Sequence, residues 1–296
     1  VAADGSGRDP SAAQAVVDEI DAAGGEAVAH TGAVADFADA AGMVRKANDA
    51  QPDLVVLTGD FVCHGQKYLD QLSDVLGRID APTFGVLGNH DHWSGAGEVR
   101  SALGRAGVEV LDNANTTITL RHQRLQLVGL DDAYTGHADR ARAVKGLRRD
   151  LPTLGLSHIA EEADGLWAAG VPLVLSGHTH AGHVTLARLH EIAIGHIAGH
   201  KYVHGLYGSR RPGPRTPRGS VYVGAGIGAS VMPLRLGERA RRELTIFELG
   251  LCPGAINEPY VEQAPMPGRP PTPEQTAKRH AKVAVKRARR ERRSRK

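Results

Sequence analysis

Cysteine is nearly absent from the 296-residue sequence, which holds only Cys63 and Cys252 and no Cys-x-x-Cys pair. We therefore expect neither a disulfide framework nor a cysteine-based zinc site. Long hydrophobic runs are missing as well: no stretch of about 18 apolar residues occurs, so no transmembrane helix is predicted. No secretory signal is visible at the start of the chain. These absences favour a cytoplasmic protein.

Charge is distributed unevenly along the chain. Residues 278–296 contain eleven Lys or Arg residues and a single acid, Glu291. The rest of the chain has 25 basic and 32 acidic residues, a net charge of −7. Such a basic tail is either a solvated segment or a binder of phosphates, on an anionic membrane surface or on nucleic acid. In the membrane case the protein would be peripheral at the inner face. No motif indicates a protein partner.

Helical and apolar segments alternate along the chain and predict an α/β fold with a mixed sheet. Helices are expected at residues 10–23, 36–50, 68–78 and 98–106, and a short strand at 26–30. The other expected strands are apolar runs of the kind buried in a parallel sheet. They cover residues 53–58, 83–87, 108–111, 125–130, 154–156, 173–175, 220–223 and 243–249.

The alternation stops after residue 251. Five prolines between residues 261 and 275 predict an extended linker. The basic tail beyond it is expected to be disordered, or helical only when bound to a partner. We therefore assign residues 252–296 to a linker and tail, outside a folded domain at 46–251.

Four short polar motifs each follow a predicted strand. Gly59-Asp60 follows the strand at 53–58, and Gly88-Asn89-His90-Asp91 follows the strand at 83–87. His158 and Gly177-His178-Thr179-His180 follow the strands at 154–156 and 173–175. Taken singly, each motif is weak, because an Asp can be a turn residue and a His a core residue. All four in order at strand ends indicate a shared site.

Physical chemistry favours a metal centre at these strand ends. In open α/β sheets, ligands collect in the crevice beyond the carboxyl ends of the strands. A carboxylate can bridge two cations, while an amide oxygen and neutral imidazoles complete the coordination. Two cations held in this way can activate a water and stabilise both oxygens of an in-line phosphoryl displacement.

With these motifs, the sequence from about residue 45 to 249 resembles the calcineurin-like metallophosphoesterases. The similarity includes Tyr202-Val203-His204-Gly205-Leu206-Tyr207 and Gly226-Ile227-Gly228-Ala229-Ser230-Val231. The resemblance implies a β-sandwich flanked by helices. It also implies hydrolysis of a phosphate-ester substrate, either a phosphodiester or a phosphomonoester. The cofactors would be two divalent metal ions, and this ligand set accepts Mn, Fe, Zn or Co.

The resemblance also implies individual roles. Asp60 would bridge the two metals, and His180 would bind the first. The second metal would be completed by Asn89, His158 and His178. His90 would contact the phosphate and act as general acid toward the leaving oxygen, and Asp91 would orient His90.

The family's opening Asp-x-His motif, which gives two ligands to the first metal, is missing from this chain. Residues 1–45 resemble instead an internal fragment of a short-chain dehydrogenase, with the join inside the expected helix at 36–50. Counting back one βαβ unit from Asp60 reaches residues 28–30. The grafted helix–strand segment would then place Val28 at the position of the missing Asp and His30 at that of the missing His.

His30 is therefore either a replacement ligand or an ordinary strand-end histidine. The first metal site is incomplete in the second case, and a catalytically weakened family member is the main alternative function. An NAD(P)-dependent oxidoreductase is less favoured, because the glycine-rich turn and the Tyr-x-x-x-Lys pair are absent. A nucleic-acid-binding protein is favoured by the basic tail alone.

Overall fold

The computed structural model describes residues 37–63, 65–182, 198–208, 219–228, 242–249 and 272–294, together with Gly195 and Gly268. The predicted helix at 10–23 and strand at 26–30 lie outside these residues, as does His30. The grafted N-terminal segment and the domain boundaries therefore stay predictions. Helix α2 (Phe37–Asp49) runs without a break through the expected join at residue 45.

The described residues form two β-sheets. The smaller sheet is parallel, with the order β1-β2-β3, and consists of Val55–Leu57, Thr83–Gly85 and Val108–Val110. The larger sheet has the order β4-β5-β6-β7-β9-β8. Its inner strands β5, β6, β7 and β9 are parallel, and β4 and β8 pair antiparallel at its two edges. The six strands are Ala114–Leu120, Gln123–Leu130, Thr153–Ser157, Leu173–Ser176, Gly205–Gly208 and Ser220–Val223.

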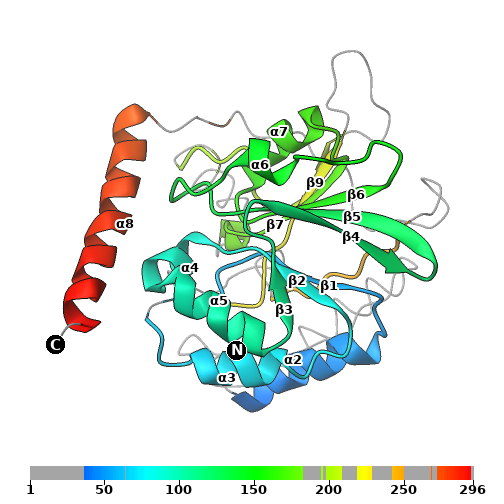
Figure 1. The fold of residues 1–296 in the computed structure, drawn as a ribbon, viewed down its shortest axis with the longest axis horizontal. Coiled ribbons are helices and arrows are strands. Elements are labelled where there is room, and N and C mark those ends of the chain that lie inside the picture. Colours follow the sequence, from blue (N-terminus) through cyan, green and yellow to red (C-terminus); the bar gives the residue numbers. More distant parts are fainter. Residues whose placement is uncertain are drawn as a thin grey trace.

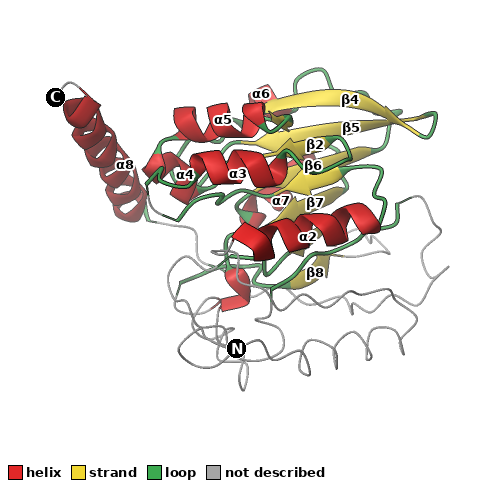
Figure 2. Ribbon diagram, turned by 90° about the horizontal axis from the view of Figure 1, so that it is seen from below, coloured by secondary structure: helices red, strands yellow, loops and turns green. Residues whose placement is uncertain are grey.

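The two sheets pack face to face and carry helices on their outer faces (Figure 1). Between the sheets lies a core built from Phe84, Val86 and Leu111 of the smaller sheet against Leu127 and Leu156 of the larger. Figure 2 shows α2, α3 and α5 lying over the strands as one layer. The helices are α3 (Leu69–Leu76), α4 (Asn89–Ser94), α5 (Ala96–Arg105), α6 (Arg140–Ala143), α7 (Ala163–Ala168) and α8 (Pro273–Ser294).

The structure confirms a β-sandwich flanked by helices, as the sequence predicted. Most expected strands between residues 53 and 223 are present, with ends shifted by a few residues. Two strands were not predicted. Strand β4 has residues that are exposed or only half-buried along its length, so it lacks an apolar run, and β8 is only four residues long.

One prediction near the C-terminus was wrong. Residues 242–249 form no strand, and their large apolar side chains at Leu244, Ile246 and Leu249 stand more than half exposed. The apolar residues of this run suggested a buried strand, but the segment contacts the body through Glu243 and through the ring of Phe247, which packs against Tyr222. The basic tail was expected to be disordered or helical only when bound; residues Pro273–Ser294 form helix α8, and the assignment of 252–296 to a linker and tail stays a prediction. None of the described helices is long and apolar enough to cross a membrane.

Candidate metal centre

Three of the expected ligands meet between the carboxyl ends of strands from both sheets. Asp60 follows β1, His158 follows β6 and His178 follows β7. One ligand atom from each lies within 4.8 Å of the others. His158 Nε2 is 3.3 Å from Asp60 Oδ2 and 3.2 Å from His178 Nδ1. The site therefore forms at the seam between the two sheets.

Glycines allow the chain segments to approach one another here. A Cβ atom at Gly88 would collide with Asp60 Oδ1 and stand 2.8 Å from the His158 ring. A Cβ at Gly59 would come within 2.7 Å of the Gly88 nitrogen and 2.9 Å of His158 Nδ1. Gly59 also has a φ of +91°, which favours glycine. The two glycines thus set how closely Asp60 and His158 approach.

Three of the expected ligand residues have strained backbones. Asp60, His178 and His180 have φ values of 60°, 72° and 50°, in the left-handed region that L-residues rarely adopt. Each such residue costs about 1–3 kcal/mol, and strain of this kind gathers at functional sites. Three instances at one set of strand ends indicate that the positions of these side chains are under functional constraint.

The ring of His158 is oriented by the other sheet. Its Nδ1 lies 2.7 Å from the carbonyl oxygen of Thr58, which directly follows β1. A carbonyl only accepts hydrogen bonds, so Nδ1 carries the proton and donates it. In the neutral ring the lone pair of Nε2 then faces Asp60 and His178. Metal-binding histidines are commonly fixed by such a bond.

Asn89, the first residue of α4, offers the clearest sign of an absent ligand. It is 2% exposed, and its Oδ1 has no hydrogen-bond partner among the described residues. A buried amide oxygen without a partner costs about 1–3 kcal/mol. A cation bound by Asp60, His158 and His178 would satisfy an oxygen of this kind, so the residues present fit a divalent metal.

The electrostatics of the cluster also favour a cation. Burial opposes ionisation of Asp60, but the neighbouring imidazole of His158, with His90 and His178, holds its pKa well below its usual value. Burial likewise opposes charge on His158, yet Asp60 raises the pKa of His158 to about 9. Burial and the nearby His158 and His200 hold the pKa of His178 well below normal. The ionised Asp60 thus draws positive charge into the site.

His90 lies beside this cluster, but its supporting residue is not the one expected. Its backbone N–H donates to Asp60 Oδ1 at 2.9 Å, and its Nδ1 lies 2.7 Å from the carbonyl oxygen of Cys63. The expected carboxylate–imidazole pair with Asp91 is absent. The reason is that the Asp91 carboxylate turns away, toward backbone N–H groups.

Asp91 holds the two ligand loops together. Its carboxylate accepts backbone hydrogen bonds from Asp60 and Gly88 at 2.9 Å and from Val62 at 3.2 Å. The Gly88 bond also caps the first turn of α4. Complete burial and the charge of Asp60 raise the pKa of Asp91 to about 7, against the effect of these hydrogen bonds. Asp91 therefore positions the backbone of Asp60 and Asn89 rather than the ring of His90.

His180, one of the two expected ligands of the first metal, lies outside this cluster. His180 begins the short 3-10 turn after β7, and it is not part of the three-residue cluster found among the described residues. His30 lies outside the described residues, so the structure leaves its role as a prediction.

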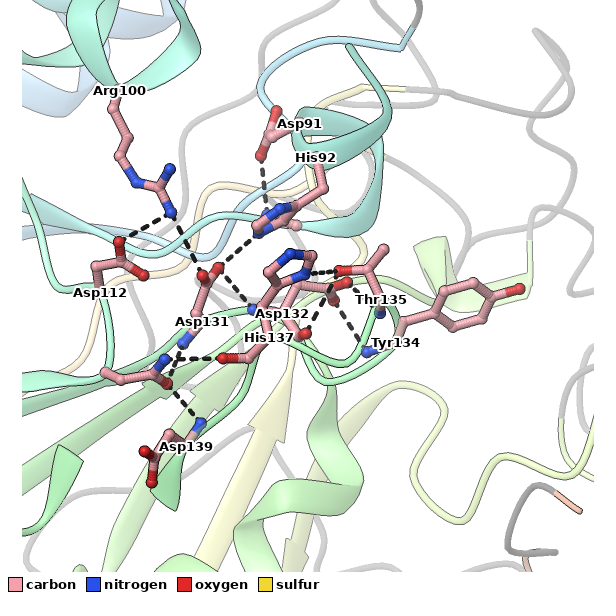
Figure 3. A network of polar contacts seen from close by, with 12 residues as sticks. Asp91, His92, Arg100, Asp112, Asp131, Asp132, Tyr134, Thr135, His137 and Asp139 are labelled. Carbon is pink, nitrogen blue, oxygen red and sulfur yellow. Dashed lines mark hydrogen bonds and ion pairs between the residues drawn. The ribbon is translucent and has the colours of Figure 1, made fainter. Parts of the chain in front are cut away.

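Two acids after β5 were missed, although they show the same strand-end signal as the four motifs. Asp131 Oδ1 lies 2.6 Å from His92 Nε2, and Asp131 Oδ2 lies 3.3 Å from Arg100 (Figure 3). Burial opposes ionisation of Asp131, but its hydrogen bond with His92 holds the pKa of Asp131 well below the usual value. Asp132 accepts the backbone N–H groups of Tyr134 and Thr135 (Figure 3). This network ties the loop after β5 to helix α4.

Two aromatic rings beside the site had no readable sequence signal. Trp93 of α4 packs edge-on against His90, with ring centroids 4.9 Å apart. Tyr134 lies 5.4 Å from the ring of His178, and the two aromatic rings are 5.9 Å apart. Trp93 and Tyr134, named here the aromatic rim, therefore flank the expected general acid and a metal ligand.

This arrangement is that of a metal-dependent phosphoester hydrolase, and comparison with known proteins agrees. The family model described as calcineurin-like phosphoesterase matches residues 29–182. The chain belongs to this family and is a phosphate-ester hydrolase.

Relatives named for the same activity match much of the chain. An uncharacterized metallophosphoesterase of Bacillus subtilis, YkuE, is 32% identical over 209 residues, covering 68% of this chain and 69% of its own. The phosphodiesterase YaeI of Escherichia coli is 31% identical, covering 68% and 72%. A Bos taurus transmembrane protein with a metallophosphoesterase domain is 30% identical, covering 71% of this chain and 48% of its own.

Proposed function

We propose that the protein hydrolyses phosphodiesters with a water activated at two divalent metal ions. The observation that carries this proposal is the cluster of Asp60, His158 and His178 beside the unsatisfied amide oxygen of Asn89. A carboxylate, an amide and two imidazoles suit Mn, Fe, Zn or Co. One of the relatives is named a phosphodiesterase, which supports diesters over monoesters.

Asp60 would bridge the two cations, and Asn89, His158 and His178 would complete the second. When bound, the metals would lower the pKa of a coordinated water and offset charge on the phosphate. His90 donates Nδ1–H to the Cys63 carbonyl, so the proton given to the leaving oxygen would come from Nε2 of the doubly protonated ring. Asp91 accepts hydrogen bonds from the backbone N–H groups of Asp60 and Gly88, and so holds the loops that carry Asp60 and Asn89 next to each other.

For the first metal, His180 and His30 are the proposed ligands. The family match begins at residue 29 and therefore includes His30. The metal content of the purified protein should fall from two ions per chain toward one when His30 is replaced by Ala. Equal metal content in wild type and His30→Ala would remove His30 from the ligand set.

The test of the proposed activity uses protein stripped of metal by a chelator. Adding Mn²⁺ should restore hydrolysis of bis(p-nitrophenyl) phosphate in wild type and leave Asp60→Asn inactive. A wild-type protein that binds Mn²⁺ yet hydrolyses this diester no faster than Asp60→Asn would instead be the weakened family member.

Binding of the basic tail to an anionic membrane or to nucleic acid, with a peripheral location, stays a prediction. Removal of residues 278–296 should weaken binding to vesicles containing anionic lipid, or to DNA, in a salt-dependent way. Unchanged binding would contradict both.

A further inference from the structure

Helix α8 lies beside the aromatic rim rather than away from the body. It packs next to α4, the short helix that carries Asn89, His90 and Trp93 (Figure 1). The imidazole of His280 sits directly over Gly136, where a side chain would collide with it. The part of α8 that touches the body therefore lies against the loop after β5 and against α4.

Two cations of α8 sit on the two rings of the rim. The Cζ atom of Arg279 lies 4.1 Å from the ring centroid of Tyr134. The Nζ atom of Lys282 lies 4.5 Å from the ring centroid of Trp93. Residues three apart share one face of a helix, so a single face of α8 presents both charges to the site.

Neither cation is neutralised by an acid. Among the residues that the structure describes, Arg279 and Lys282 form no ion pair with a carboxylate. Each instead rests on a ring, a contact that contributes only about 0.5–1 kcal/mol at an exposed site. Both charges thus stay available to an anion.

Both cations are also close to the reacting centre. The Arg279–Tyr134 and Tyr134–His178 contacts, taken end to end, put the guanidinium within about 10 Å of the His178 ring, comparable to a Debye length of about 10 Å. Through Trp93, Lys282 is equally close to the ring of His90. At this range the charges are only partly screened from a phosphate bound at the metals.

We propose that Arg279 and Lys282 bind a second anionic group of the substrate, so that the site prefers phosphoesters bearing another phosphate or carboxylate. This inference rests on the proposed function, because the scissile phosphate is placed at the metal centre. The aromatic rim lies between the two anions, and it holds Arg279 and Lys282 in place before substrate arrives.

The binding test compares thymidine 3′,5′-bisphosphate with thymidine 5′-monophosphate by calorimetry on Mn²⁺-loaded protein. Replacing both cations, Arg279→Gln with Lys282→Gln, should weaken the bisphosphate about tenfold and the monophosphate less than about twofold. The control Lys278→Gln removes a charge from an exposed residue of the same helix and should change neither constant. Arg279→Lys keeps the charge and should retain most of the bisphosphate affinity.

A kinetic test separates this proposal from the proposed function. Thymidine 5′-(p-nitrophenyl phosphate) is compared with its 3′-phosphorylated form, and the double variant should raise KM for the 3′-phosphorylated substrate alone, with kcat unchanged. If the double variant affected both substrates and both ligands equally, the proposal would be overturned. Faster turnover of both substrates by the double variant would also overturn it, because it would show that α8 obstructs the site. Absence of any hydrolysis by wild type would contradict the proposed function, while the binding constants would still decide the role of the cations.

Discussion

The two sheets bring different chemistry to one site. The smaller sheet carries the proposed oxygen ligands, Asp60 after β1 and Asn89 after β2, and α4 adds the expected general acid His90. The larger sheet supplies imidazoles, from His158 after β6 and His178 after β7. Neither sheet holds a complete ligand set. A cation bound by all four residues would cross-link the two halves of the sandwich.

Hydrogen bonds also order the seam between the two sheets. The His158 ring of the larger sheet donates to the Thr58 carbonyl of the smaller one. Within the smaller sheet, Asp91 fastens the Asp60 loop to the start of α4. The oxygen side is therefore held by its own backbone bonds, whereas the imidazole side is oriented across the seam.

Removal of His90, the expected general acid beside the oxygen ligands, should have the largest effect on activity. His90→Ala should lower kcat for bis(p-nitrophenyl) phosphate by about 10²–10⁴-fold, because general acid catalysis is lost while the ligands remain. The metal content should stay that of wild type. The control His122→Asn changes an exposed histidine in the turn between β4 and β5 and should leave kcat unchanged. Equal rates for His90→Ala and wild type would remove His90 from the catalytic group.

Metal removal tests the cross-link itself. Saturating Mn²⁺ at about 100 times its dissociation constant should stabilise the fold by about 2.7 kcal/mol, seen as a higher melting temperature. Asp60→Asn on the oxygen side and His178→Ala on the imidazole side should each abolish most of this shift. If only one of the two variants lost the Mn²⁺-dependent rise in melting temperature, the metal would be held by a single sheet. The idea that the metal joins the two sheets would then be wrong.

Close approach on the oxygen side should be sensitive to a single methyl group. Gly88 has an extended backbone that alanine can adopt, so Gly88→Ala is penalised by collision with Asp60 and His158 alone. The variant should lose about 2–3 kcal/mol of unfolding free energy in urea, together with metal affinity. Gly97→Ala in α5, where nothing lies within 4 Å of the added Cβ, should be neutral or slightly stabilising. Equal stability of both variants would show that the loops can separate at little cost.

The sequence predicted that Asp60, His158 and His178 would lie together, and it did so for a physical reason. Asp60, Asn89, His158 and His178 stand directly after apolar strands, and parallel strands bring their carboxyl ends together. The same rule would have found Asp131 and Asp132. It could not find the Cys63 carbonyl that holds His90, since a backbone acceptor leaves no trace in residue type.

The other features that the sequence did not predict depend on contacts between residues far apart in the chain. The rim residues Trp93 and Tyr134 meet where Asp131, bonded to His92, ties the loop after β5 to α4. Helix α8 has the composition of a solvated segment, and its place beside α4 depends on cation–ring contacts that no local pattern encodes. Strand β4 is held by pairing along the length of β5 rather than by its own apolar residues.

The smallest effect is expected at Glu243, which fastens residues 242–249 to the larger sheet. Its carboxylate accepts from the Tyr222 hydroxyl and the Ala225 N–H, and it lies 2.9 Å from His204 Nε2. Burial opposes ionisation, but His204, Thr245 and Tyr222 lower the pKa of Glu243 to about 2 from its usual 4.5.

Because the folded pKa of Glu243 is depressed, its contribution is present above pH 4.5 and lost as the pH falls toward about 2. Urea unfolding should show Glu243→Gln less stable than wild type by about 2 kcal/mol at pH 7, with the difference vanishing near pH 2. Asp70→Asn, at a side chain that is 95% exposed, should show little difference at either pH. A Glu243→Gln deficit that stayed constant with pH would mean that shape, not charge, holds this segment, and that acid unfolding of the larger sheet begins elsewhere.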